Sequence, residues 1–128
     1  MKKDLSQFSD IELLVRTFYQ KATFDPSIGH FFTQVIEIDW EAHFPQMFRF
    51  WDSVIFGTAT YRGNPMLKHI KLNQKSPMKP EHFETWIRLW TETVDELFEG
   101  KTAEIAKSKA HQIKDLMVFK VEQTSKFA

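Results

Sequence analysis

The clearest helical pattern in the chain lies in the stretch 80-PEHFETWIRLWTETVDELFEG-100. Its apolar residues recur three or four positions apart, which places them on one broad stripe of a helix. Pro80 suits the first helical position, and Gly100 suits a C-terminal stop. A stripe this wide has to be covered by other elements. It comprises Phe83, Trp86, Ile87, Trp90, Val94, Leu97 and Phe98.

Two similar patterns flank this stretch. The first predicts a helix from Asp10, as its N-terminal cap, to Phe24, before Asp25-Pro26 ends it. The second predicts a helix that Thr102 caps. The expected inward faces are Ile11, Leu14, Val15, Phe18 and Ala22 for the first helix, and Ile105, Ala106, Ala110, Ile113, Met117 and Val121 for the last.

Three further segments complete the predicted fold. Residues 27–35 form a short aromatic segment of 3₁₀ type, and Asn64-Pro65 opens a short helix over 65–72, followed by a polar linker over 73–79. Residues 39–56 form a helix whose face is Trp40, His43, Met47, Phe50 or Trp51, and Val54. Pro45 lies inside this last pattern, so we expect a distorted first turn and regular helix from about Phe44. Six unequal helices predict an all-α fold.

Composition narrows the classes of protein that the chain can represent. Its 128 residues fit one domain over 1–128, and 17 basic residues balance 17 acidic ones, so neither nucleic acid nor an anionic membrane is expected as a partner. The absence of cysteine excludes disulfides and thiolate metal sites. No apolar run has the length of a signal peptide or a membrane span, and we expect a cytoplasmic location.

Aromatic residues are unusually frequent, at 15% of the chain with 13 Phe and 4 Trp. They supply either a core of large side chains or the lining for a flat apolar ligand. Composition alone does not separate these two interpretations.

The five histidines are the first candidates for chemistry. We expect His82 and His111 at the surface. His30 lies in an aromatic turn, where we expect it to pack or to face solvent. His69 ends a short helix, where it could cap the helix dipole or, with Nδ1 bonded to a carbonyl, aim Nε2 at a metal. His43 lies on an apolar helical face.

No His-x-x-x-His or Glu-x-x-His pair accompanies these histidines, so a conventional zinc or di-iron site lacks its ligands. One or two histidines in an aromatic cavity can still bind a metal that brings its own ligands, as the iron of a porphyrin does. Tyr19 and Trp86 each add one polar hydrogen on an apolar body. Either one taken alone is better explained as an ordinary core aromatic.

Several short motifs, in order, resemble a known family. They are Phe18-Tyr19, Phe31-Phe32, Trp40-x-x-His43, Phe50-Trp51, Tyr61-x-Gly63-x-Pro65-x-x-x-His69 and Phe83-x-x-Trp86. Together they span more than half the chain and resemble the third group of the truncated haemoglobins. The resemblance implies a globin-like two-over-two helical sandwich that binds haem b, iron protoporphyrin IX.

The resemblance also implies roles for individual residues. His69 would be the iron ligand on the proximal side, Tyr19 and Trp86 the distal hydrogen-bond donors, and His43 a distal gate whose orientation Pro45 could alter. Phe32, Met47 and Phe50 would line the haem, with Phe31 as a further candidate. Tyr61, Arg62 and Lys68 would lie near the haem propionates.

These roles predict a protein that binds O₂ and other diatomic ligands such as NO, CO or cyanide, for oxygen binding or transport. An alternative is a haem-dependent redox enzyme that acts on nitric oxide, nitrite or peroxide, in detoxification or peroxidase-like turnover, and receives electrons from a separate reductase. A cofactor-free helical module that docks a partner through its aromatic stripe is a third interpretation.

Overall fold

The computed structural model describes residues 2–59, 61 and 63–126, and every regular element in them is helical. The elements are α1 (Phe8–Thr23), the π-helical turn η1 (Phe31–Val35), α2 (Trp40–Phe56), α3 (Pro65–Lys75), α4 (Pro80–Leu97) and α5 (Lys101–Lys126). The predicted all-α class and the six predicted segments are therefore confirmed.

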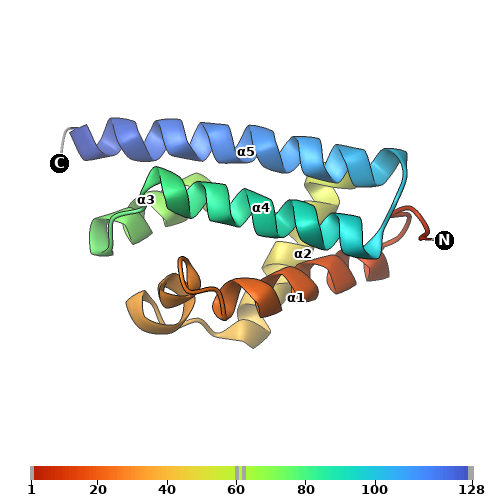
Figure 1. Ribbon diagram of the computed structural model, residues 1–128, viewed down its shortest axis with the longest axis horizontal. Helices are drawn as coiled ribbons and strands as arrows, with labels where there is room; N and C mark the ends of the chain where they lie inside the picture. The colour runs from red at the N-terminus through yellow and green to blue at the C-terminus, as the bar shows by residue number, and fades with distance from the viewer. Residues whose placement is uncertain (1, 60, 62, 127–128) are drawn as a thin grey trace.

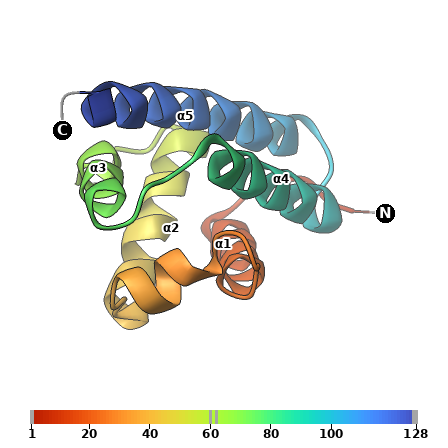
Figure 2. The same ribbon diagram turned by 60° about the vertical axis from the view of Figure 1, so that its left-hand side comes forward.

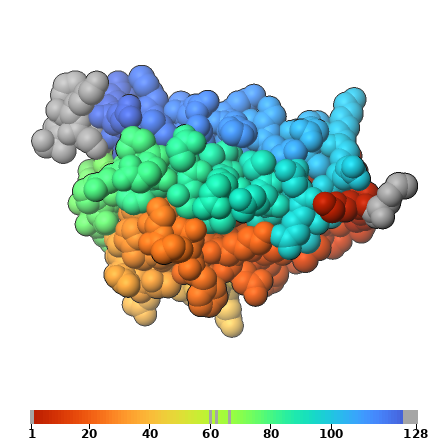
Figure 3. Space-filling view, in the orientation of Figure 1, coloured from red at the N-terminus to blue at the C-terminus, as the bar shows by residue number. Residues whose placement is uncertain are grey.

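The helices form two layers of two. The pair α1–α2 packs on the pair α4–α5 through contacts of α1 with α4 and of α2 with α5 (Figures 1 and 2). The short helix α3 contacts α5 and η1, beyond one end of this sandwich. In Figure 3, α4 lies at the surface between α5 and the orange segment that holds the end of α1 and η1. This arrangement is the two-over-two sandwich that the sequence predicted.

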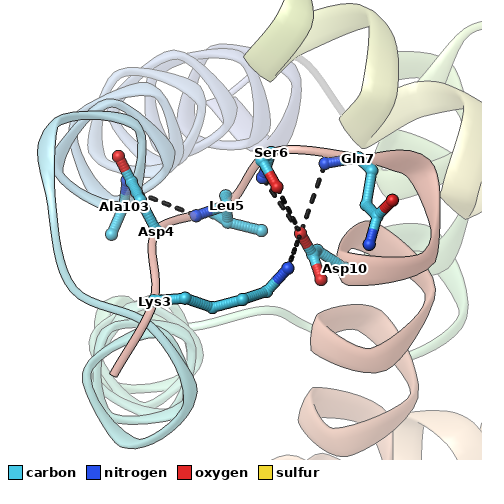
Figure 4. Close-up of polar contacts among 7 residues, drawn as sticks. All are labelled: Lys3, Asp4, Leu5, Ser6, Gln7, Asp10 and Ala103. Atoms are coloured by element: carbon cyan, nitrogen blue, oxygen red, sulfur yellow. Dashed lines mark hydrogen bonds and ion pairs between the residues drawn. The ribbon is translucent and has the colours of Figure 1, made fainter. Parts of the chain in front are cut away.

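The start of α1 differs from its prediction. The helix begins at Phe8, so Asp10 stands in its first turn and is not the cap. The buried Asp10 carboxylate accepts hydrogen bonds from the backbone N–H groups of Ser6 and Gln7 and pairs with the Lys3 ammonium at 2.9 Å (Figure 4). Burial alone would raise the pKa of Asp10, but these three bonds outweigh it and lower that pKa.

The helix α2 has nearly its predicted bounds, but it is regular from Trp40, not from about Phe44, and the Asp39 side chain caps it by accepting the Ala42 N–H at 3.4 Å. Pro45 stands inside the regular helix, where it removes only the bond to the carbonyl four residues before. Of the predicted pair, Trp51 is the buried residue, and Phe50 is half-buried. Phe48 and Ile55 are also buried, which the prediction missed.

The helix α3 is longer than predicted, and the segment before α2 contains a π-helical turn, which is wider than the expected 3₁₀ turn. The Asn64 side chain accepts the Leu67 N–H at 3.0 Å, which confirms the predicted start, but α3 continues to Lys75 and takes in residues 73–75 of the expected linker. His69 therefore lies in the middle of a helix, and its interpretation as a C-terminal cap is wrong. The segment predicted as 3₁₀ holds the π-helical turn η1.

The junction of α4 and α5 is held by the N-terminal segment. The Asp4 carboxylate accepts the backbone N–H of Thr102 at 2.9 Å and that of Ala103, which Figure 4 draws beside it, at 2.8 Å. Asp4 therefore caps α5 in place of the predicted Thr102. Gly100 stands at the start of α5, not at the end of α4. The predicted inward face of α5 is correct except for Ile105, which is 36% exposed.

Replacing Gly100 by alanine is expected to destabilise the fold strongly. Gly100 has a φ of 137°, and a Cβ atom there would lie 2.6 Å from the Asp4 Cγ atom. Backbone strain and the loss of the Asp4 cap together predict a fall of about 3 kcal/mol in the free energy of unfolding. Chemical denaturation measures this change.

Gly57 offers a matched control for this substitution. It also has a positive φ, of 73°, but its Cβ position has no neighbour within 4 Å. Gly57→Ala should therefore cost only the strain of the left-handed backbone, roughly 1–2 kcal/mol. Equal losses in the two variants would show that the close approach of Asp4 contributes nothing.

Candidate functional site

A cavity of about 320 Å³ opens among α1, η1, α2, α3, α4 and α5, within the range that small-ligand sites occupy. Its walls are mainly apolar and aromatic. The polar groups among its lining residues come from α1, α2 and α4, one from each, and from α3, which supplies the rest. The apolar lining includes Phe18, Phe32, Ile36, Ile38, Met47, Phe50, Trp51, Leu72, Ile113 and Met117.

A smaller hollow of about 80 Å³, which we call the second lobe, adjoins this cavity. The two share six lining residues, so they are parts of one site. The second lobe extends between η1 and the start of α4. Its own lining residues are Ile28, Phe31, Met78, His82 and Phe83.

His69 stands on the α3 side of the cavity with one ring nitrogen already engaged. Its Nδ1 atom lies 2.7 Å from the Pro65 carbonyl oxygen, one helical turn earlier. Because a carbonyl can only accept, Nδ1 carries the proton, and Nε2 keeps its lone pair. Burial and the nearby Lys68 lower the pKa of His69, although the bond to Pro65 opposes them. The imidazole is therefore neutral near pH 7, with Nε2 suited to bind a metal.

Tyr19 and His43 line the cavity from α1 and α2. The Tyr19 hydroxyl lies 3.1 Å from His43 Nε2, within hydrogen-bond distance. Burial raises the pKa of Tyr19 far above its usual range, so the phenol stays protonated. Burial lowers the pKa of His43, and Lys68 and His69 add to that effect. The two side chains form a neutral pair that can donate or accept.

Trp86 adds an indole to the cavity lining, and its N–H has no acceptor among the residues that the structure describes. Trp90, one turn further along α4, provides the contrast because its Nε1–H donates to the Ala106 carbonyl at 3.2 Å. The Trp90 ring stacks on Trp51 at a centroid distance of 4.0 Å, and Trp86 stacks with both at 6.4 Å. The stack holds the Trp86 ring in place, and its N–H is left without an acceptor among the described residues.

Most of the remaining predicted site residues line the cavity, but not all of them do. Phe32, Met47, Phe50 and Lys68 line the cavity. Tyr61 is not among its lining residues but packs on Phe50, with ring centroids 5.2 Å apart, and its buried hydroxyl has no partner among the described residues. The prediction for Arg62 lies outside the described residues.

The sequence analysis missed two lysines, Lys71 and Lys75, which join Lys68 in lining the cavity. The three residues recur at positions i, i+3 and i+7 of α3, and α3 contains no acidic residue. Their spacing was a usable signal. It went unused because the helix was expected to end at Leu72.

Of the two histidines that were predicted at the surface, one is exposed and the other is half-buried. His111 is exposed, as predicted, whereas His82 is half-buried and lines the second lobe. Over residues 2–59, 61 and 63–126, no three His, Asp or Glu side chains gather into a site for a bare metal ion. No helix in the same residues has the length and apolar character needed to cross a membrane.

Comparison with known proteins gives this geometry a family context. No protein-family model matches the chain. The chain is 27% identical over 116 residues to the group 3 truncated hemoglobin ctb of Campylobacter jejuni, covering 88% of this chain and 89% of that protein. The crystal structure of the group III truncated hemoglobin from Campylobacter jejuni superposes with a TM-score of 0.79 at 26% identity, covering 91% of this chain and 92% of that chain.

This chain has the fold of a group 3 truncated haemoglobin. The resemblance that the ordered motifs indicated is therefore confirmed over 88–91% of the chain. The truncated-globin fold also explains why α3 is short and lies outside the main sandwich, where it presents His69 to the cavity.

Proposed function

We propose that this protein is a haem-binding globin that binds O₂ and other diatomic ligands. The observation that carries the proposal is the state of His69. Its Nδ1 is bonded to the Pro65 carbonyl, so its Nε2 keeps a lone pair, and the residue lines an aromatic cavity. In this proposal His69 is the only permanent protein ligand to the iron.

The residues present fit haem b better than a bare ion. One imidazole with apolar neighbours supplies too few ligands for an isolated metal, but a porphyrin brings four nitrogens of its own. The aromatic walls suit a flat apolar ring, and the cavity together with its second lobe gives that ring room. Haem supplies an iron atom that binds O₂, NO, CO or cyanide.

The lysines of α3 extend the earlier expectation for the haem propionates. We place Lys71 and Lys75 beside Lys68 as partners for these two carboxylates, because all three line the cavity and α3 has no acidic residue to neutralise them. Lys68 already bonds the Gln46 side chain at 3.1 Å, which leaves Lys71 and Lys75 as the freer pair.

Tyr19 and Trp86 are the proposed donors to a diatomic ligand, and His43 is the proposed gate. The Tyr19 hydroxyl is within hydrogen-bond distance of His43 Nε2. If His43 moves away, the Tyr19 hydroxyl loses this partner and becomes available to a bound ligand. Trp86 needs no such release because its indole N–H has no acceptor among the described residues.

The same pair of donors favours a second candidate function. Donors that polarise a ligand also suit turnover of nitric oxide, nitrite or peroxide, for which a separate reductase would supply electrons. Unchanged turnover of all three in a Tyr19→Phe, Trp86→Phe double variant would remove the reason for this alternative.

Titration of the purified protein with haemin tests the main proposal. We expect saturation at one haem per chain and a Soret band that shifts on reduction and on addition of CO. A Lys71→Gln, Lys75→Gln variant should bind haem a few-fold more weakly, since each exposed ion pair contributes about 0.2–1 kcal/mol. Lys109→Gln, on the exposed face of α5, should bind as the unaltered protein does. A protein that never acquires a Soret band would contradict the proposal.

A further inference from the structure

We propose that His82 is a positioning residue for this site: its neutral ring caps α4 and steadies the α4 wall of the second lobe, and its protonation releases that wall. The cap itself stands without haem. Only its effect on ligand binding rests on the proposed function.

The cap is a hydrogen bond at the start of α4. The Lys79 backbone N–H, just before Pro80, donates to His82 Nδ1 at 2.9 Å. Glutamate or glutamine often fills this position in a helix and reaches back to the same N–H group. Here the imidazole does so, and Lys79 itself offers no capping hydroxyl or carboxylate. The first turn is also closed by the His82 N–H, which donates to the Lys79 carbonyl at 2.9 Å, and the His82 ring adds the bond that satisfies the Lys79 N–H.

The direction of this bond makes the cap sensitive to protonation. Nδ1 accepts from an N–H group, so it must be unprotonated, and the ring proton sits on Nε2. A proton added to Nδ1 turns the acceptor into a donor that faces another donor. The bond to Lys79 cannot survive that change, and the backbone N–H loses its protein partner.

The surroundings of His82 favour the neutral ring. Burial lowers the pKa of His82, and the neighbouring His30 and Lys79 lower it further against the opposing effect of Glu81. The His30 ring lies 5.8 Å from the His82 ring and the Phe31 ring lies 5.0 Å from it. The other titratable groups that line the second lobe are Tyr19 from α1 and His69 from α3, and α5 presents the uncharged Met117.

The sign of the pH effect follows from the lowered pKa. The unfolded chain binds a proton at His82 more readily than the folded chain does, so acid favours unfolding of this turn. The cap is fully formed above the unfolded pKa of about 6.5 and is lost as the pH falls through the lower folded value.

The link to the functional site runs along α4. His82 and Trp86 are one turn apart, both line the second lobe, and the helix pairs the Trp86 backbone N–H with the His82 carbonyl. Phe83, between them, also lines the lobe. Fraying of the first turn therefore loosens the backbone that holds Trp86 on its N-terminal side.

The experiment follows two NMR signals from pH 8 to pH 5: hydrogen-exchange protection of the Lys79 amide and the chemical shift of the Trp86 indole N–H. In the unaltered protein we expect Lys79 protection to fall about fivefold as the pH drops, with a parallel movement of the Trp86 signal. His82→Gln should keep both constant, because an amide oxygen accepts the same bond and does not titrate. His82→Phe should lack Lys79 protection at every pH.

His111→Gln, on the exposed face of α5, serves as the matched control and should behave as the unaltered protein does. A pH-dependent loss of Lys79 protection that persists in His82→Gln would overturn the cap. A titrating Lys79 signal beside an unmoved Trp86 signal would overturn the link to the site. Both signals can be recorded without haem, so a failure to bind haem leaves this test intact.

Discussion

Replacing His69 by alanine is expected to weaken haem binding by at least about 100-fold. The estimate follows from the role of its ring: loss of an outer partner of a metal ligand already costs about 10–100-fold in metal affinity, and His69 is the proposed ligand itself. Its Nδ1 bond to the Pro65 carbonyl at 2.7 Å holds the ring in place, and alanine removes this oriented ring. Haem transfer to an excess of a stronger haem acceptor measures the loss.

Two comparisons separate a lost axial bond from a damaged fold. Added imidazole should restore the ferrous and CO-bound spectra of His69→Ala, because a free ring can occupy the space that the side chain left. His43→Ala should retain haem and change only the rates of ligand entry and exit. Equal loss of haem from both variants would contradict the division between ligand and gate.

Removing both proposed donors, in Tyr19→Phe, Trp86→Phe, is expected to speed O₂ dissociation by about 30- to 10³-fold. Each neutral donor contributes about 1–2 kcal/mol as a net hydrogen bond, and the two contributions combine. Burial keeps Tyr19 protonated, so the effect should persist across neutral pH. Stopped-flow displacement of O₂ by CO measures the rate.

Trp90→Phe is the matched control for the Trp86 substitution. Both residues belong to the same indole stack, but the Trp90 N–H is satisfied by Ala106 and its ring does not line the cavity. Trp90→Phe should lower the free energy of unfolding and leave O₂ dissociation nearly unchanged. An equal acceleration in Trp86→Phe and Trp90→Phe would show that packing, not hydrogen bonding, sets the rate.

Local patterns in the sequence predicted most of the fold. The buried face of α1, from Ile11 to Ala22, follows from helical spacing alone, and Asn64-Pro65 marked the start of α3 because both cap and proline act within one turn. Contacts between distant residues left no such pattern. Nothing near Thr102 indicates that its N–H would be bound by Asp4, 98 positions earlier in the chain.

The candidate site shows the same difference between local patterns, which can be read from the sequence, and contacts between distant residues, which cannot. The spacing around His69 suited a helix cap because the helix was expected to end at Leu72. The extension of α3 to Lys75 depends on packing against α5 and η1, which no local pattern indicates. Tyr19 and His43 are 24 positions apart, and only the resemblance to a family placed them together before the structure did. His82 was taken for a surface residue because the turn that covers it, with His30 and Phe31, lies on another segment.

The tryptophan stack has a consequence for how this protein can be observed. All four tryptophans lie in or next to the cavity: Trp51 and Trp86 line it, Trp90 stacks on them, and Trp40 contacts both Tyr19 and His43. A pigment that absorbs where indoles emit would therefore quench the intrinsic fluorescence of the whole chain at short range. The unlabelled protein thus reports occupancy of its own site through its ultraviolet emission, in dilute solution and without any attached dye.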